Sequence, residues 1–74
     1  MKLRYDPRVD ALYISFKKGP VQVTTVRLSE DVAVDLGPNE EVVGIEVLGA
    51  SEHLALAKTS PTVILEGLQA EVTP

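Results

Sequence analysis

Four carboxylates in the middle of this 74-residue sequence are the side chains best placed to do chemistry. They are Glu30, Asp31, Asp35 and Glu46. Strand pairing would set Asp31 across from Glu46 on the outer face of a sheet, and clustered oxygens of this kind bind hard cations. The spacing is not that of a calcium-binding loop, however, and no histidine supports it. We therefore assign no metal ligand, and two interpretations stay open: solvated surface acids, or a metal- or small-ligand-binding protein.

His53 is the only histidine and thus the only candidate for an imidazole general base. Ser51 and Glu52 precede it, but adjacent residues do not face one another on a helix, and no glycine-framed turn surrounds Ser51. An enzyme would need Asp35, Glu46 and His53 to converge in one pocket. The sequence itself indicates no catalytic residue and no cofactor site, and we expect a protein that is not an enzyme.

Size and composition predict a single small domain that spans residues 1–74. A chain of this length is near the lower limit for one self-sufficient hydrophobic core, so we expect a homo-oligomer, most simply a dimer. The lack of cysteine fits a reducing compartment, and no apolar run is long enough for a signal peptide or a membrane span. The net charge of -4 opposes nucleic-acid binding. These features predict a cytoplasmic protein that binds neither nucleic acid nor membrane.

Five runs of apolar residues predict the strands of an antiparallel sheet. The expected strands are residues 2–5, 11–16, 21–28, 32–36 and 42–48. Leu12, Ile14 and Phe16, for example, alternate with polar residues at the two-residue period of a strand with one buried face. A turn signal follows each run, so the strands are expected to pair in chain order as a five-stranded antiparallel β-meander.

The requirement that all apolar side chains share one face predicts the register of this sheet. The expected pairs are Tyr5 with Leu12, Leu3 with Ile14, Ile14 with Val23, Phe16 with Val21, Val26 with Val34, Val34 with Val43, and Val32 with Ile45. The apolar pattern changes parity at Thr24-Thr25, which predicts a bulge or a sharp twist there.

A short helix is expected after the fifth strand, capped by Ser51 and continuing to about Lys58, where it would pack on one face of the sheet. The fold class is therefore α+β, with a strand-like C-terminal tail. Residues 59–74 form a candidate interaction or edge-strand segment, because they add apolar side chains beyond the needs of one small domain. Those side chains are Val63, Ile64, Leu65, Leu68 and Val72. The segment would pair with its own sheet, with a second copy, or with a different partner.

Tyr13 and Gly44 complete the candidate interaction surface. Tyr13 is expected on the outer face opposite Arg4, where it either anchors a partner or packs over the Arg4 stem. Gly44 interrupts a strand, which indicates either a bulge or a close approach by another group. Opposite Ala33, it would leave a shallow apolar patch on which a second subunit could dock.

Four short motifs combine in the first 51 residues. They are Tyr5-Asp6-Pro7, Asp10-Ala11-Leu12-Tyr13-Ile14, Glu30-Asp31 with Asp35, and Gly44-Ile45-Glu46-Val47-Leu48 followed by Ala50-Ser51. This combination resembles domain-of-unknown-function family 2283, a group of small bacterial and archaeal proteins. The resemblance implies a small sheet domain with no established activity. Through neighbouring genes for small toxin-like proteins, it also implies an antitoxin or partner-binding role.

Taken together, the size, the spare apolar residues of the tail and the missing catalytic constellation predict a protein–protein interaction module that self-associates. Two alternatives stay open. One is an antitoxin-like partner of a small toxin, and the other is a metal- or small-ligand-binding protein or enzyme that uses surface carboxylates.

Overall fold

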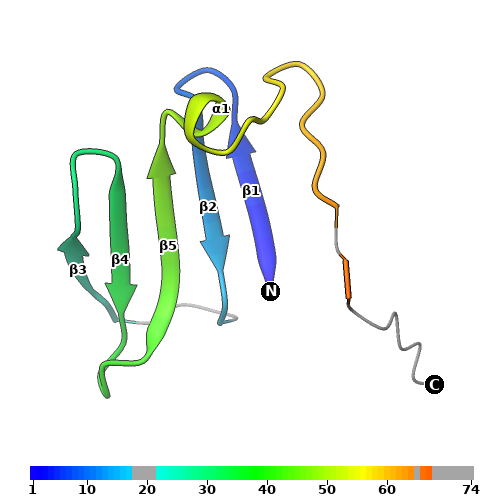
Figure 1. Cartoon of the computed structure of the whole chain (residues 1–74). Helices are drawn as coiled ribbons and strands as arrows, with labels where there is room; N and C mark the ends of the chain where they lie inside the picture. The colour runs from blue at the N-terminus through cyan, green and yellow to red at the C-terminus, as the bar shows by residue number, and fades with distance from the viewer. Residues whose placement is uncertain (18–21, 65, 68–74) are drawn as a thin grey trace.

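The computed structural model describes residues 1–17, 22–64 and 66–67. It contains one five-stranded antiparallel sheet and one short helix, so the predicted α+β class is confirmed (Figure 1). The elements are β1 (Lys2–Asp6), β2 (Ala11–Ser15), β3 (Thr24–Arg27), β4 (Val32–Leu36), β5 (Val42–Leu48) and α1 (Ala50–His53). No helix in these described ranges is long and apolar enough to cross a membrane.

The strand order is β1-β2-β5-β4-β3, which corrects the predicted pairing of the second strand with the third. β2 pairs with β5 instead, so Ile14 lies opposite Ile45 rather than Val23. Phe16 follows the same pairing, because its N–H donates to the Val43 carbonyl oxygen at 2.8 Å. The expected Phe16 partner, Val21, lies outside the described residues. β5 is the central strand and the longest, and most of its residues are buried or half-buried between its two neighbours.

The register within the hairpins agrees with the apolar pattern. Tyr5 pairs with Leu12 and Val26 with Val34, as predicted. Val34 pairs with Ile45 rather than Val43, a shift of two residues that keeps every side chain on its predicted face. The β3–β4 register is regular at Thr24 and Thr25, so no bulge lies there, and an irregularity is found instead between Asp35 and Leu36 in the β4–β5 pair. β3 begins at Thr24, so the parity change in the sequence falls at the start of the strand.

α1 is shorter than predicted and begins differently. It covers Ala50–His53, and its N-cap is Gly49 in the left-handed conformation, with a φ of 62°. Ser51 lies inside the helix rather than at the cap, because its side chain bonds to Asp10. Ala55 has a φ of 53°, which is incompatible with helix continuation toward Lys58.

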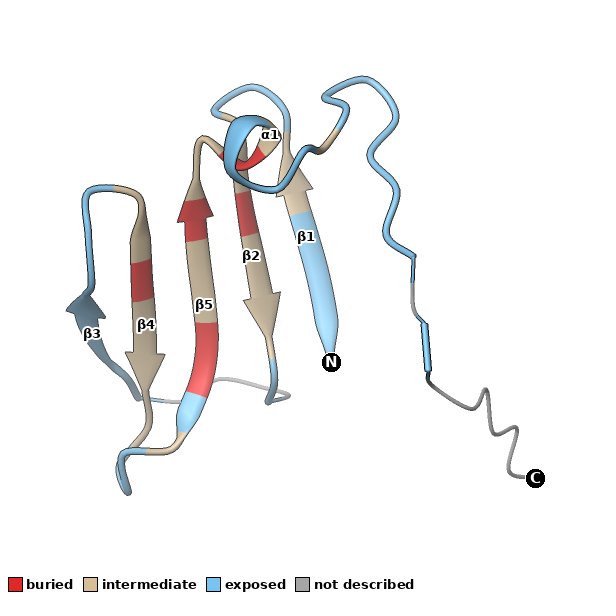
Figure 2. Ribbon diagram, viewed as in Figure 1, coloured by how far each residue is buried: buried red, intermediate tan, exposed pale blue. Residues whose placement is uncertain are grey.

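The hydrophobic core is small and lies under α1 at one end of the sheet (Figure 2). Leu12 of β2, Val47 of β5 and Ala50 of α1 form its buried centre, and Leu56 packs against them. A helix of four residues covers only this end. Among the described residues, no second layer covers the rest of the same face, although Val43 on β5 is buried there.

We call the uncovered part of this sheet surface the open face. It consists of Leu3, Ile14, Phe16, Val26, Val34 and Ile45, of which Ile14, Val34 and Ile45 are half-buried. Ile14 and Ile45 also pack against the core. Leu3, Phe16 and Val26 are between 39% and 42% exposed. The chain exposes 5968 Å², whereas a compact 8.0 kDa monomer exposes about 4,500 Å². Part of this excess comes from the open face and part from the extended residues after α1.

The described residues after α1, 54–64 and 66–67, contain no helix and no strand. Figure 1 shows them extending away from the sheet on the β1 side. Val63 and Ile64 are 55% and 80% exposed. The expected strand is therefore not found in this part of the tail, and Leu65, Leu68 and Val72 lie outside the described residues.

Candidate functional site

The outer face of the sheet carries a hydrogen-bonded cluster around Asp35. The Tyr13 hydroxyl donates to Oδ2 of Asp35 at 2.7 Å, and the Thr25 hydroxyl donates to Oδ1 at 2.6 Å. These bonds from Thr25 and Tyr13 hold the pKa of the Asp35 carboxyl below its ordinary value. The same bond to Asp35, together with partial burial, raises the pKa of Tyr13 to about 12. The carboxylate is thus already occupied by two donors from the sheet itself.

Gly44 is needed because the Tyr13 ring lies directly over it. A Cβ built at Gly44 would overlap the hydroxyl and ring carbons of Tyr13. The close approach predicted from this glycine is therefore made by a residue of the same chain. Gly44 pairs with Ser15 and Asp35, not with Ala33 as predicted, because the β4–β5 register is shifted. A role of Tyr13 and Gly44 in partner binding stays a prediction.

A second polar contact covers the outer face beside this cluster. Ala33 pairs with Arg27 on one side and Glu46 on the other, which corrects the expected pairing of Asp31 with Glu46. The Arg27 guanidinium lies 3.8 Å from the Glu46 carboxylate. Ala33 is only 2% exposed, because these flanking side chains and the neighbouring strands surround its small methyl group. The outer face is therefore largely covered by the chain's own side chains.

Asp10 connects the first hairpin loop to the start of α1. Its carboxylate accepts bonds from the Tyr5 hydroxyl at 2.6 Å, the Ser51 hydroxyl at 2.7 Å and the Ser51 N–H at 3.0 Å. Its carbonyl oxygen accepts from the Ala50 N–H, and its φ of 53° turns the loop toward the helix. We call Tyr5, Asp10 and Ser51 the Asp10 cluster. The cluster joins three of the four sequence motifs, those that contain Tyr5, Asp10 and Ser51.

The Asp10 cluster shifts the acidity of two of its members. The bonds from Tyr5 and then Ser51 lower the pKa of the Asp10 carboxyl. Desolvation, followed by the bond to Asp10, raises the pKa of Tyr5 to about 12. The donors and the acceptor are therefore in their favoured protonation states at neutral pH, as expected for a structural cluster rather than a general base.

The candidate catalytic residues do not converge. His53 lies 2.9 Å from Asp31, whereas Ser51 donates to Asp10, so Ser51 and His53 do not form a nucleophile–base pair. Asp35 is held by its cluster, and Glu46 faces the Arg27 guanidinium. Within the described part of the chain, no three histidine or acidic side chains lie close enough to hold a metal ion.

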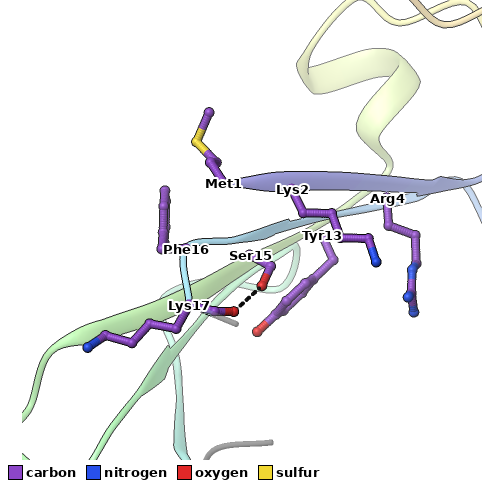
Figure 3. Close-up of a pocket in the computed structure, with 7 residues that line it drawn as sticks. All are labelled: Met1, Lys2, Arg4, Tyr13, Ser15, Phe16 and Lys17. Atoms are coloured by element: carbon purple, nitrogen blue, oxygen red, sulfur yellow. Dashed lines mark hydrogen bonds between the residues drawn. The ribbon is translucent and has the colours of Figure 1, made fainter. Parts of the chain in front are cut away.

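Sequence reasoning missed a basic hollow beside β1 and β2. The hollow has a volume of about 430 Å³ and is lined by Met1, Lys2, Arg4, Tyr13, Ser15, Phe16 and Lys17 (Figure 3). Figure 3 shows Lys2, Arg4 and Tyr13 extending to one side of the sheet, with Met1 and Phe16 on the other. The available signal was the placement of Lys2 and Arg4 two residues apart on the first strand, which sets both on one face.

These features define a small α+β domain that consists of a single antiparallel sheet closed at one end by the Asp10 cluster. The chain belongs to the family described as "Protein of unknown function (DUF2283)", whose family model matches residues 2–51. The matched residues include all five strands and end at Ser51 of the Asp10 cluster. No curated protein and no solved structure matches the chain.

Proposed function

We propose that this protein is a protein–protein interaction module that self-associates through its open face, with a dimer as the simplest assembly. The supporting observation is the uncovered apolar surface of the sheet. Stable domains bury the apolar face of a sheet against a second layer, and here α1 supplies that layer only over the core around Leu12 and Val47. A partner is needed to cover the rest.

The exposed apolar side chains of the open face favour association. Leu3, Phe16 and Val26 are between 39% and 42% exposed. Each square ångström of apolar surface removed from water contributes about 25 cal/mol before the costs of association. A partner that covers these side chains is therefore favoured by their burial.

A second copy fits this surface because the open face carries no charged side chain. Strand alternation places the charged residues Lys2, Arg4, Asp35 and Glu46 on the opposite face of the sheet. Face-to-face packing across a two-fold axis would keep these charges in water. It would also separate them from the partner's sheet by at least the spacing of two packed sheets, about 10 Å. The net charge of -4 then opposes dimer formation only weakly.

The test compares the mass in solution of the wild-type protein with that of Val26→Glu. Val26 is 39% exposed on the open face, so the substitution should leave the fold intact while placing a charge in the interface. Val9→Glu is the matched control, because Val9 is 66% exposed in the loop between β1 and β2. Sedimentation equilibrium should give twice the 8.0 kDa chain mass for wild type and for Val9→Glu, and the chain mass for Val26→Glu.

Circular dichroism on the same samples would show whether Val26→Glu is folded. If that variant is unfolded, Leu3→Glu serves in its place, because Leu3 is 41% exposed near the start of β1. A wild-type protein that stays monomeric at millimolar concentration would overturn self-association. A wild-type monomer that binds a small toxin-like protein at equal stoichiometry would instead support the antitoxin-like alternative.

A further inference from the structure

We propose that the free edge of β1 binds an extended acidic peptide from another protein, which adds a strand to the sheet and places its carboxylates against Lys2 and Arg4. This site shares Leu3 and Phe16 with the open face, but its specificity comes from Lys2 and Arg4 on the opposite face of β1, so it does not depend on self-association. β1 is the first strand in the order β1-β2-β5-β4-β3, and no described strand pairs with its other edge. An unpaired edge can accept an added strand through main-chain hydrogen bonds.

The charges on β1 indicate which peptide this edge would accept. Lys2 and Arg4 lie on the same face, and no carboxylate of the described residues lies within ion-pair distance of either. By contrast, Arg8, Lys17 and Arg27 each have a carboxylate partner. Asp6 lies on the same face of β1 but forms an ion pair with Arg8, so Lys2 and Arg4 make the start of this edge locally basic. An acidic strand is therefore electrostatically complementary to it.

The side chains of β1 alternate between the two faces of the sheet, and this alternation predicts the sequence pattern of the peptide. Lys2 and Arg4 face one side of the sheet, and Leu3 and Tyr5 face the other. An added strand with acidic residues at every second position would place its carboxylates beside the two cations. Its intervening apolar residues would then lie beside Leu3 and Tyr5. The expected ligand is thus a peptide in which acidic and apolar residues alternate.

The hollow next to this edge provides room for the ligand's side chains. Tyr13 forms one wall, and its ring is held in place by the bond to Asp35 and by its position over Gly44. Figure 3 shows the Lys2 and Arg4 side chains on the same side of the sheet as this ring. A wall that is already fixed before binding reduces the entropy cost of ordering the site.

Other strands of this chain fit the edge less well. Antiparallel pairing of β1 with β1 of a second copy would bring Lys2 and Arg4 near the same cations of the partner, and like charges across strands are destabilising. The tail residues 61–66 contain one acidic residue, Glu66, and thus offer no alternating pair of carboxylates. A separate acidic peptide avoids the repulsion between cations and supplies the alternating carboxylates.

The test uses fluorescence anisotropy with a labelled hexapeptide of alternating glutamate and valine. Wild-type protein should bind it saturably, and Lys2→Glu with Arg4→Glu should weaken binding by about tenfold or more. Lys58→Glu is the control, because it removes a positive charge after α1 and should leave the affinity within about twofold. If the double variant fails to fold, Lys2→Gln with Arg4→Gln tests the same contacts with a smaller change.

Two further peptides separate strand addition from simple charge attraction. A peptide of alternating lysine and valine should not bind, and one with prolines in place of the valines should lose most of the affinity because it lacks their N–H donors. Equal binding of the proline peptide, or no saturable binding of the glutamate peptide at about 1 mM, would overturn the proposal. Lys2 and Arg4 would then serve only to prevent other strands from pairing with the free edge of β1. Val26→Glu should bind the peptide normally, which keeps this test independent of the dimer test.

Discussion

The two faces of the sheet differ in how far the chain covers them by itself. On the outer face, Tyr13 packs over Gly44 and bonds to Asp35, and Ala33 is 2% exposed. On the apolar face, α1 covers the core at one end, while residues such as Val26 remain 39% exposed. The polar face around Asp35 is therefore satisfied within one chain, whereas no described element covers the apolar face away from α1.

The difference between the two faces has a simple physical cause. A sheet of alternating residues satisfies its polar face with short cross-strand contacts, but its apolar face needs a whole second element. The four-residue α1 is too short to be that element, although the Asp10 cluster fixes it firmly at one end of the sheet. The chain thus forms the hydrogen bonds of its polar face by itself but leaves part of its apolar face exposed.

The largest effect is expected where the apolar face is already covered. Leu12 is 5% exposed under α1, so Leu12→Ala should lower the free energy of unfolding by about 2–4 kcal/mol. Leu28 is 65% exposed, and Leu28→Ala should change it by less than about 0.5 kcal/mol. Urea unfolding of both variants at one protein concentration provides the comparison. Equal losses would contradict a core confined to one end of the sheet.

A smaller loss is expected on the outer face, from Gly44→Ala. The new Cβ would displace the Tyr13 ring, and overpacking of this kind costs about 1–3 kcal/mol. The double variant with Tyr13→Ala removes the obstructing ring, so its total loss should be smaller than the sum of the two single losses. Strict additivity in urea unfolding would show that the ring contact is not the reason for the glycine.

Much of the sheet could be predicted from the sequence because the two-residue period determines which side of a strand is apolar. The Tyr5–Leu12 and Val26–Val34 pairs follow from this period and from short connections. The period cannot distinguish registers that differ by two residues, so it pairs Val34 with Val43 as readily as with Ile45. It also cannot choose among antiparallel neighbours, so it does not place β5 beside β2.

The sites depend on contacts that no local pattern reveals. Asp10 and Ser51 are 41 residues apart, and the loop conformation at Asp10 brings their side chains together. Ser51 has the side chain of a typical N-cap, but the Asp10 carboxylate competes for it and Gly49 takes the cap position. Gly44 did indicate a close approach, and only the β2–β5 pairing identifies Tyr13 as its source.

The smallest expected effect is the pH dependence of the stabilisation from the Asp10 cluster. It should distinguish the contribution of these polar contacts from that of apolar packing. Folding lowers the pKa of Asp10 from its ordinary value of 3.8. At a pH between the folded and unfolded pKa values, this carboxyl therefore binds more protons in the unfolded chain than in the folded one. The stabilisation from its bonds is therefore present above pH 3.8 and lost as the pH falls through the folded pKa. NMR titration of the Asp10 carboxyl should give a pKa below 3.8, and Tyr5→Phe should raise it, because the Tyr5 bond is the main cause of the shift.

Tyr13→Phe is the matched control for this titration, because its hydroxyl bonds to Asp35 and not to Asp10. It should leave the Asp10 titration unchanged and raise the pKa of Asp35 instead. The apolar contacts of Leu12 and Val47 contain no titrating group, so acid should weaken the Asp10 cluster before it disturbs the core. If the Asp10 carboxyl titrated at or above 3.8, the cluster would not be the polar clamp that holds α1, and the covered end of the sheet would depend on packing alone.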